Sequence, residues 1–325
     1  MISKAILLVG GKGTRLAPLT NTTPKPMLKV AGRSVTEHQI VKAREAGVKE
    51  IVLATSYLAE VFEPHFGDGS AFGISITYAV EREPLGTGGA IANAAAALQL
   101  EIDESIFIFN GDVLSGHDLN SQANLHVSKN ADVTLHLVEV EDARAYGCVP
   151  IDEEQRVQDF LEKMDNPVAK TINAGCYIFS QRTIATIPRD TVISVERQTF
   201  PSLLSSGATV LGYQDSRYWI DMGTPQSMIQ ASRDLILQPE ISRATPSPQD
   251  ASLLAQGVVV DPSSIVDGGS YIDADTVIGA RCRISGSIIG EKSEIGSDVT
   301  IIDSYIAPRS RVKSGSHLKG EIFGF

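Results

Sequence analysis

The stretch AILLVGGKGTRLAPLTNTTPKPML occupies residues 5–28 and begins as an apolar run that breaks into glycines. Similar apolar, β-branched runs recur further along the chain and alternate with segments of helical periodicity. This alternation is typical of a largely parallel sheet with crossover helices, so we predict an α/β fold. The predicted strands are 5–9, 50–55, 74–80, 106–110, 133–140 and 175–180, and the predicted crossover helices are 35–47 and 86–100.

The composition changes at QPEISRATPSPQDAS (238–252), which is rich in Pro, Ser and Gln, as linkers are. Beyond it, one β-branched or leucine residue recurs at steps of six, with steps of five at two places. This period is typical of hexapeptide β-helix repeats, and it predicts between three and four coils. We therefore predict an N-terminal domain at 1–237, a linker at 238–256 and a β-helix at 257–325. The repeating positions are Val260, Val266, Ile272, Ile278, Ile284, Ile289, Ile295, Ile301, Ile306, Val312 and Leu318.

Composition restricts the possible partners. The chain has 325 residues and a formal net charge of −11, without a Lys/Arg-rich run, which argues against nucleic acid or an anionic membrane as partner. We find neither a membrane-spanning run nor a secretory signal, so we expect a cytoplasmic protein. The cysteines Cys148, Cys176 and Cys282 are widely spaced, which favours buried free thiols. Any phosphate bound here should belong to a small ligand.

The opening loop departs from two common phosphate-binding motifs. A dinucleotide fingerprint needs a third glycine where GKGTRL has Leu16, and a Walker loop needs a spacing and a terminal Lys-Ser/Thr pair that GGKGTR lacks. What remains is a strand that ends in small residues, followed by Arg15 and by Lys25 between prolines. Such a loop suits a triphosphate, because its backbone N–H groups can approach closely. A tight turn with solvated basic residues is the alternative.

Further motifs follow in the same part of the chain. Together with GGKGTRLAPLT and PKPML they resemble the sugar-1-phosphate nucleotidyltransferases, and they are most similar to the bacterial mannose-1-phosphate guanylyltransferases with a C-terminal left-handed β-helix. The resemblance covers the whole N-terminal domain and implies a Rossmann-like, glycosyltransferase-A-like fold there. One departure is Met164, where the family usually has proline after Glu-Lys. The motifs are EPLGTGGAI (83–91), FNGDVL (109–114), FLEKM (160–164), INAGCYIF (172–179), SVERQTFP (194–201) and YWIDMGTP (218–225).

The resemblance implies a reaction in which mannose 1-phosphate attacks the α-phosphorus of GTP and releases pyrophosphate. It implies Mg²⁺ bound by Asp112 and Asp221, whose carboxylates are ligands of the kind this ion prefers. Arg15 is then expected to contact the triphosphate, Lys25 to face the phosphates, and Lys163 to hold the sugar phosphate. No general base is required, since a phosphate monoester dianion is already nucleophilic.

The same resemblance implies two groups of binding residues. Guanine presents two donors on one edge, and a carboxylate accepts from both, so Glu81 is the candidate for base recognition. Other nucleotides or hexose phosphates within the same chemistry, such as UTP or dTTP with glucose 1-phosphate, remain alternatives, as does a non-catalytic regulatory subunit. The expected nucleotide-binding residues are Leu8, Gly10, Gly11, Gly13, Thr14, Glu81, Pro84, Gly86, Thr87 and Gly88. The expected sugar-binding residues are Gly147, Glu162, Asn173, Gly175 and Glu196, the last with structural hydrogen bonding as an equal alternative.

The β-helix ends in an open coil, whose unpaired backbone groups need a cover. Ile322, Phe323 and Phe325 are apolar and close to that end, so they suit a cap or a subunit contact. We therefore predict a homo-oligomer that depends on the β-helix, and we expect a chain truncated near residue 240 to be monomeric and active.

Overall fold

The computed structural model describes residues 1–161 and 164–325, and the chain divides into two compact units. The first unit joins Met1–Gly11 to Gln39–Trp219, and the second joins Lys12–His38 to Ile220–Phe325. The predicted loop 12–28 thus packs in the same unit as the C-terminal region. The domain boundaries given above stay a prediction. Among the described residues, no helix has both the length and the apolar composition needed to cross a membrane.

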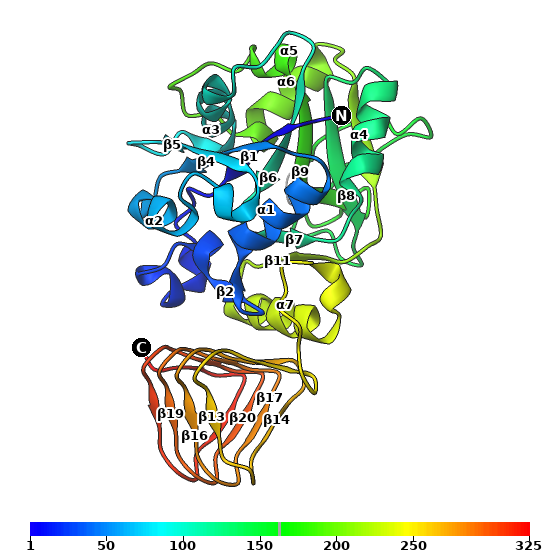
Figure 1. Cartoon of the computed structure of the whole chain (residues 1–325). Coiled ribbons are helices and arrows are strands. Elements are labelled where there is room, and N and C mark those ends of the chain that lie inside the picture. Colours follow the sequence, from blue (N-terminus) through cyan, green and yellow to red (C-terminus); the bar gives the residue numbers. More distant parts are fainter. Residues whose placement is uncertain (162–163) are drawn as a thin grey trace. The chain divides into compact units, whose positions relative to one another are not determined.

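The first unit contains a mixed, mostly parallel sheet (Figure 1). Its strands are β1 (Lys4–Leu8), β4 (Glu50–Thr55), β5 (Ser75–Val80), β6 (Ser105–Asn110), β8 (Val133–Glu139), β9 (Thr171–Ser180) and β10 (Val210–Gln214). Their order is β10-β8-β9-β6-β1-β4-β5. The described pairings are parallel, except that β9 runs antiparallel to β6 and β8. All six predicted strands are confirmed, and β10 was missed.

Helices of the first unit pack on this sheet. The core cluster includes Ile91 and Ala92 of α3 with Ile6 of β1 and Val52 of β4, all almost fully buried. The helices are α2 (Phe62–Phe66), α3 (Gly86–Ala95), α4 (Leu119–Ser128), α5 (Gln181–Ile184) and α6 (Phe200–Ser205). The first four residues of α1 (Val35–Glu45) are assigned to the second unit, and the rest of this helix belongs to the first. The short turns are η4 (Ala59–Val61), η5 (Ser70–Phe72), η6 (Ala96–Leu98) and the π-helical η7 (Val195–Thr199). Both predicted helices are confirmed, although α3 gives way to the turn η6.

The second unit combines the loop after β1 with the C-terminal region. The loop contains η1 (Thr14–Leu16), η2 (Leu19–Asn21), η3 (Lys25–Met27) and the hairpin strands β2 (Lys29–Val30) and β3 (Arg33–Ser34). The chain returns through α7 (Pro225–Leu237) and η8 (Pro239–Ile241). Ser232 of α7 accepts a hydrogen bond at 2.9 Å from the backbone N–H of Ala31, and Lys29 forms an ion pair of 2.9 Å with Asp273. Within this unit, the hairpin is therefore tied to both α7 and the C-terminal strands.

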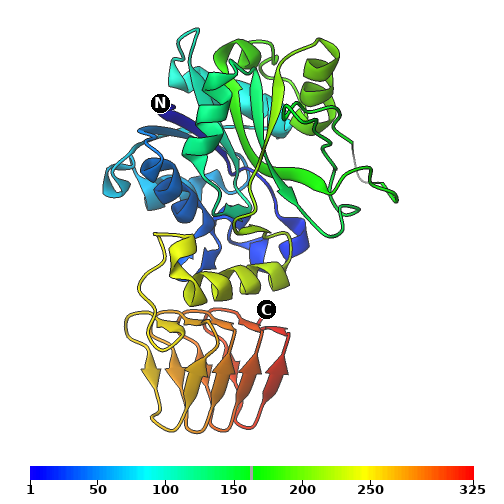
Figure 2. The ribbon, with the colours of Figure 1, turned by 90° about the vertical axis from the view of Figure 1, so that its right-hand side faces the viewer.

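The C-terminal strands form a parallel β-helix, which confirms the predicted architecture. Its three sheets are β12-β15-β18-β21-β24, β13-β16-β19-β22 and β14-β17-β20-β23, and Figure 2 shows the coils side by side. Ile272, Ile278, Ile284 and their repeats point into a single apolar core. The strands are β12 (Ser252–Leu254), β13 (Val259–Val260), β14 (Ile265–Asp267), β15 (Ser270–Ile272), β16 (Val277–Ile278), β17 (Arg283–Ser285), β18 (Ile288–Ile289), β19 (Glu294–Ile295), β20 (Thr300–Ile302), β21 (Tyr305–Ile306), β22 (Arg311–Val312), β23 (His317–Lys319) and β24 (Ile322–Phe323).

The β-helix is longer than the repeat predicted. Two of its sheets have four strands and one has five, against the predicted three to four coils. The extra strands are β12, which lies in the segment predicted as a linker, and β24. Leu254, which pairs with the inward Ile272, and Phe323, which pairs with Ile306, lie just before and just after the run of positions on which the coils were counted. The prediction of buried free thiols is confirmed for all three cysteines.

Candidate active site

Gly13 lets the opening loop fold tightly around Lys25. The residue has a φ of 60°, and a Cβ there would lie 2.9 Å from the Lys25 Cβ. Its carbonyl accepts hydrogen bonds from the Thr20 hydroxyl at 3.0 Å and from the Leu16 N–H at 2.9 Å. A side chain at this position would displace the lysine stem, so the loop requires glycine here. Thr14, the next residue, is exposed and begins η1.

The second unit brings together three of the predicted catalytic residues. Lys25 is 7% exposed, and its Nζ lies 3.7 Å from Oδ1 of Asp221, the last residue of β11 (Trp219–Asp221). The Arg15 guanidinium lies against Gly223, where a Cβ would approach Nη1 to 2.9 Å. Two cations and one carboxylate therefore come from the two sequence motifs GGKGTR…PKPML and YWIDMGTP. Such a set suits a polyanion that carries a divalent cation.

In the first unit, the carboxyl ends of neighbouring parallel strands present further predicted residues. Leu8 ends β1, and its carbonyl accepts from the Gly111 N–H at 2.9 Å. Asp112 follows directly, between β6 and β7 (Val113–Ser115). The Gly10 carbonyl accepts from the Ser56 hydroxyl at 3.2 Å, and Gly11 beside it is exposed. Ligands of open α/β sheets bind at this edge, so Gly10 and Asp112 lie where the fold predicts a site.

Glu81 follows β5 at the same edge. Its Oε2 accepts from the Leu85 N–H at 3.1 Å, whereas Oε1 is buried with no hydrogen-bond partner among the described residues. Burial raises the pKa of this carboxyl, and the hydrogen bond from Leu85 opposes that shift. Glu81 also lines a cavity of about 480 Å³ together with Val80 and Asn93. A buried acceptor without a partner is costly, so Oε1 is suited to a ligand donor.

The start of α3 is fastened to η7. The Gly88 N–H donates to the Ile193 carbonyl at 2.8 Å, and a Cβ on Gly86 would approach the same oxygen. The Thr87 hydroxyl donates to Glu196 Oε2 at 2.9 Å and accepts from the Val195 N–H at the same distance. Ser194 donates to the same oxygen of Glu196, also at 2.9 Å. Glu196 therefore makes structural hydrogen bonds in this unit. Pro84 before the helix is exposed.

Three predicted sugar-binding residues lie on or beside β9. Asn173 accepts from the Gly175 N–H at 3.1 Å, and its Nδ2 donates to the Tyr177 hydroxyl at 2.8 Å. Gly147 precedes Cys148, which bridges to both Leu161 and Ile172 of β9. The predicted residues Glu162 and Lys163 lie outside the described part of the chain.

Sequence reasoning missed Tyr177. Its hydroxyl accepts from Asn173 and, at 3.4 Å, from Asn110 at the end of β6. Burial, followed by the nearby Glu196 carboxylate, raises the pKa of this phenol, so it stays neutral. Tyr177 thereby joins the asparagine before Asp112 to the asparagine of the predicted sugar pocket. The only signal in sequence is one tyrosine within the apolar run INAGCYIF.

The carboxylates of Asp112 and Asp221 are of a kind that binds a divalent ion with few protein ligands. In the described part of the chain, no three His, Cys, Asp or Glu side chains gather as a metal cluster. Mg²⁺ usually binds through one or two carboxylates and takes its other ligands from phosphates and water. Asp112, between β6 and β7 of the first unit, and Asp221, at the end of β11 in the second unit, each offer one carboxylate of that kind.

Comparisons with known proteins extend these observations. The sequence profile of the family described as nucleotidyl transferase matches residues 4–238. The chain is 46% identical over 295 residues to a mannose-1-phosphate guanylyltransferase of Mycobacterium tuberculosis, covering 90% of this chain and 81% of that protein. It is 32% identical over 328 residues to a mannose-1-phosphate guanyltransferase of Debaryomyces hansenii, covering 98% and 89%. The structure of HddC from Yersinia pseudotuberculosis complexed with GMP-PN is 28% identical, with a TM-score of 0.61 over 72% of this chain and 100% of that one.

Proposed function

Since this chain belongs to the nucleotidyl transferase family, we propose that it is a mannose-1-phosphate guanylyltransferase. A phosphate oxygen of mannose 1-phosphate forms a bond to the α-phosphorus of GTP, the bond from that phosphorus to the β-phosphate oxygen breaks, and pyrophosphate leaves. The product is GDP-mannose. The observation that carries the proposal is the grouping of Arg15, Lys25 and Asp221 from two motifs within a chain 46% identical to a protein of that name.

The second unit supplies charges for the triphosphate. Arg15 is exposed and contacts the phosphates, favouring departure of pyrophosphate, while the buried Lys25 faces them from the other side of the loop. Positioned charges of this kind stabilise phosphoryl-transfer transition states, which need little other chemistry from a protein. The metal, which we propose is Mg²⁺, would neutralise phosphate charge, with Asp112 and Asp221 as its protein ligands. Lys163 holds the attacking sugar phosphate.

Glu81 supports guanine as the base. Because Oε2 is committed to the Leu85 N–H, Oε1 is the oxygen left for the donors on the edge of guanine. The remaining nucleotide contacts come from Leu8, Gly10 and the residues at the start of α3. The N–H of Gly88 is already donated to the Ile193 carbonyl.

For the sugar, we propose a pocket shaped by Gly147, Asn173 and Gly175, with Glu162 accepting from hydroxyl groups. Asn173 is fixed on one side by Tyr177 and on the other by the Gly175 N–H, so its amide is held in one orientation. Glu196 also belongs to the proposed pocket, and its Oε2 is held in place by hydrogen bonds from the Thr87 and Ser194 hydroxyls. A preformed set of polar groups of this kind discriminates sugars by leaving unpaired partners with the wrong one.

The β-helix is proposed to hold a homo-oligomer together. Tyr305 stacks on Phe325 with ring centroids 6.2 Å apart, and Phe325 remains 63% exposed. An exposed apolar ring of this kind suits a subunit contact. A cytoplasmic location and the absence of nucleic-acid and membrane partners remain predictions.

The test is release of pyrophosphate by the purified full-length chain with Mg²⁺, each nucleoside triphosphate in turn, and mannose or glucose 1-phosphate. We expect turnover with GTP and mannose 1-phosphate to exceed every other combination by at least about tenfold, the effect of one differential hydrogen bond to a charged group. Preference for UTP or dTTP with glucose 1-phosphate would transfer the same chemistry to another substrate pair. GDP-mannose binding without turnover would favour a regulatory subunit.

A further inference from the structure

The segment that carries Asp112 is held by side chains of α1. Gln39 and Lys42 lie one helical turn apart, so both face the same neighbours. The Gln39 amide donates from Nε2 to the Asn110 carbonyl at 2.7 Å and to the Val113 carbonyl at 2.9 Å. These two carbonyls lie on either side of Gly111 and Asp112. One amide therefore fixes both ends of the turn.

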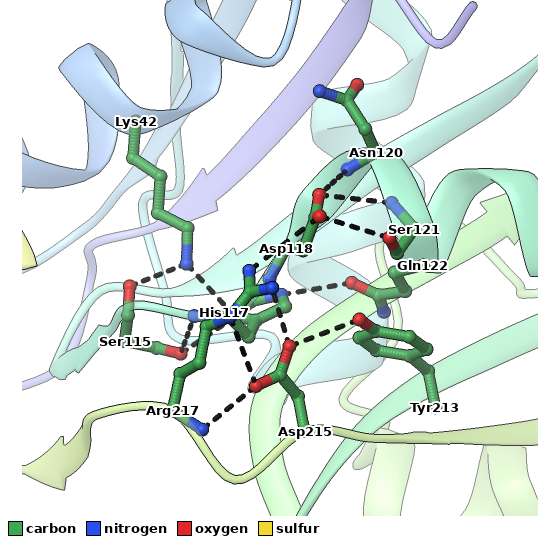
Figure 3. Close-up of polar contacts among 10 residues, drawn as sticks. All are labelled: Lys42, Ser115, His117, Asp118, Asn120, Ser121, Gln122, Tyr213, Asp215 and Arg217. Atoms are coloured by element: carbon green, nitrogen blue, oxygen red, sulfur yellow. Dashed lines mark hydrogen bonds and ion pairs between the residues drawn. The ribbon is translucent and has the colours of Figure 1, made fainter.

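Lys42 holds the far end of the same segment. Its Nζ donates to the Ser115 carbonyl at 2.5 Å and to His117 Nδ1 at 3.0 Å, as Figure 3 shows. His117 in turn contacts Gln122 Oε1 through Nε2 at 3.1 Å, and Gln122 donates to the Thr134 carbonyl of β8. The lysine thus connects the segment after Asp112 to α4 and to the sheet.

The surroundings of Lys42 restrict its amine to these contacts. Burial lowers the pKa of Lys42 to about 8, while Cys176 and Asp215 act in the opposite direction. Asp215 is itself committed, since it accepts from the Tyr213 hydroxyl at 3.1 Å and from the backbone N–H of Asp118 at 3.2 Å (Figure 3). A lysine in this environment is costly to bury, and a leucine or methionine would avoid that cost.

Gln39 has a similar unexplained cost. Its side chain is 6% exposed, and Oε1 is buried with no hydrogen-bond partner among the described residues. An apolar side chain of the same size would leave no such orphan. What an apolar side chain lacks is the pair of N–H donors aimed at Asn110 and Val113. The backbone around Asp112 is therefore what this amide serves.

We propose that Gln39 and Lys42 are positioning residues that set the direction of the Asp112 carboxylate toward the metal. The inference rests on the proposed role of Asp112 as a metal ligand. Outer contacts that orient a ligand typically account for about 10–100-fold in metal affinity or activity. Neither residue touches substrate or metal in this proposal; both act through the backbone from Asn110 to Ser115.

The experiment uses the full chain with Gln39→Leu and Lys42→Met, and with Asp112→Asn as the reference for loss of a ligand. Binding of Mn²⁺–GTP without sugar phosphate is measured by water proton relaxation, and kcat and KM are measured separately. We expect both variants to weaken Mn²⁺ binding by about tenfold and to lower kcat by a similar factor, with little change in KM for mannose 1-phosphate. The matched control is Arg44→Met, because Arg44 on the same helix donates to the Phe72 carbonyl at 3.0 Å, away from Asp112.

Any of four outcomes overturns the inference. Wild-type Mn²⁺ affinity in both α1 variants, beside a loss in Asp112→Asn, would leave the metal role intact and remove only the positioning role. Unchanged affinity in Asp112→Asn would overturn the metal role, and the inference with it. An equal effect of Arg44→Met would show that general loosening of α1 is the cause. If Lys42→Met does not fold, Lys42→Gln, which keeps a donor on a shorter side chain, is expected to show a smaller loss of affinity; wild-type affinity there would also contradict the proposal.

Discussion

The two oxygens of Glu81 have different roles, and this allows a sharp test. In Glu81→Gln the amide oxygen is expected to take the place of Oε2, because the Leu85 N–H needs an acceptor. The amide nitrogen then lies at the position of Oε1 and presents donors toward the donors of guanine. We expect the preference for GTP over ATP in kcat/KM to fall by at least about tenfold, as a charged hydrogen bond becomes a donor–donor contact. Glu83→Gln, in an exposed neighbour, serves as the control; equal discrimination in both variants would remove Glu81 from base recognition.

His136 should make the protein sensitive to acid. Its ring is 1% exposed, stacks on His117 with centroids 3.6 Å apart, and has no hydrogen-bond partner among the described residues. Burial, followed by the Lys42 charge, lowers its pKa from 6.5 to about 3. The unfolded chain therefore binds a proton below about pH 6.5 that the folded chain refuses, so stability is complete above that pH and falls as the pH drops toward 3.

For His136→Phe, which keeps the stacked ring, we expect a smaller loss of stability on going from about pH 7.5 to about pH 5. The difference from wild type should be about 2 kcal/mol, since one pKa unit corresponds to about 1.4 kcal/mol. Urea midpoints at the two pH values measure it. Parallel pH slopes for wild type and His136→Phe would contradict the assignment.

Among individual residues, the sequence motifs predicted the charged residues of the candidate site, but nothing in the sequence predicted the residues that hold them in place. Arg15, Lys25, Asp112 and Asp221 were chosen from spacing and resemblance, and the first two lie with Asp221 in one unit as a charged group. Lys42 gave no signal, because a lysine on a helix is ordinarily solvated. Its burial depends on Ser115, His117 and the sheet, which are distant in sequence and meet only in the folded chain.

The β-helix contains a ladder of buried serines that runs from coil to coil. The hydroxyls of Ser270, Ser287 and Ser304 are buried, and each donates to a carbonyl of its own coil. Each also accepts from the next coil: the N–H groups of Ser287, Ser304 and Glu321 donate to the Oγ atoms of Ser270, Ser287 and Ser304 at 3.2, 3.1 and 3.0 Å, in that order. The ladder therefore satisfies corner N–H groups that no strand pairs.

Replacement of the middle serine tests the ladder. Ser287→Ala leaves the buried N–H of Ser304 without its acceptor, which should cost about 1–3 kcal/mol of stability. We expect a lower midpoint of thermal unfolding for this variant. Ser316→Ala removes only an exposed turn contact to the Lys313 carbonyl and should leave the midpoint nearly unchanged. Equal midpoints for the two variants would mean that water or relaxation satisfies the corner N–H.

The elements were predictable where periodicity is local. The strands 50–55 and 106–110 follow from apolar runs, and the β-helix from its steps of six. The direction of β9 was not predictable, because antiparallel pairing with β6 and β8 is decided by neighbours far away in the chain. The burial of Ser287 could not be predicted, because serine is usually exposed.

At the level of the whole molecule, the contacts within the second unit change the expected effect of removing the C-terminal residues on turnover. The hairpin after Lys25 holds Lys29 against Asp273, and Gly32 against Leu253 and Tyr271. Removal of 238–325 deletes all three partners. We therefore expect the truncated chain to lose at least about tenfold in turnover as Lys25 loses its support, instead of remaining active as the sequence suggested. Light scattering should show whether the homo-oligomer is lost as well.

A full-length control separates support of the loop from association. Asp273→Asn weakens the contact with Lys29 while the β-helix and its tip remain. We expect this variant to keep the oligomeric state of the wild type and to lose part of the turnover. A truncated chain with wild-type turnover would refute the supporting role, and an unchanged oligomer after truncation would refute the role of the β-helix in association.

The spacing between ladder serines gives the β-helix a natural unit of length. Ser270 and Ser287, and Ser287 and Ser304, are 17 residues apart, and from β15 onward each strand pairs with its counterpart one coil later at the same interval. Excision of 287–303 would therefore join Gly286 to Ser304 with Tyr305 and Ile306 in the places of Ile288 and Ile289. A cut one residue longer or shorter would have to be taken up at a corner, as happens between the first two coils, whose strands pair 18 residues apart. Removal of one whole coil therefore shortens the β-helix while every later inward residue keeps its place.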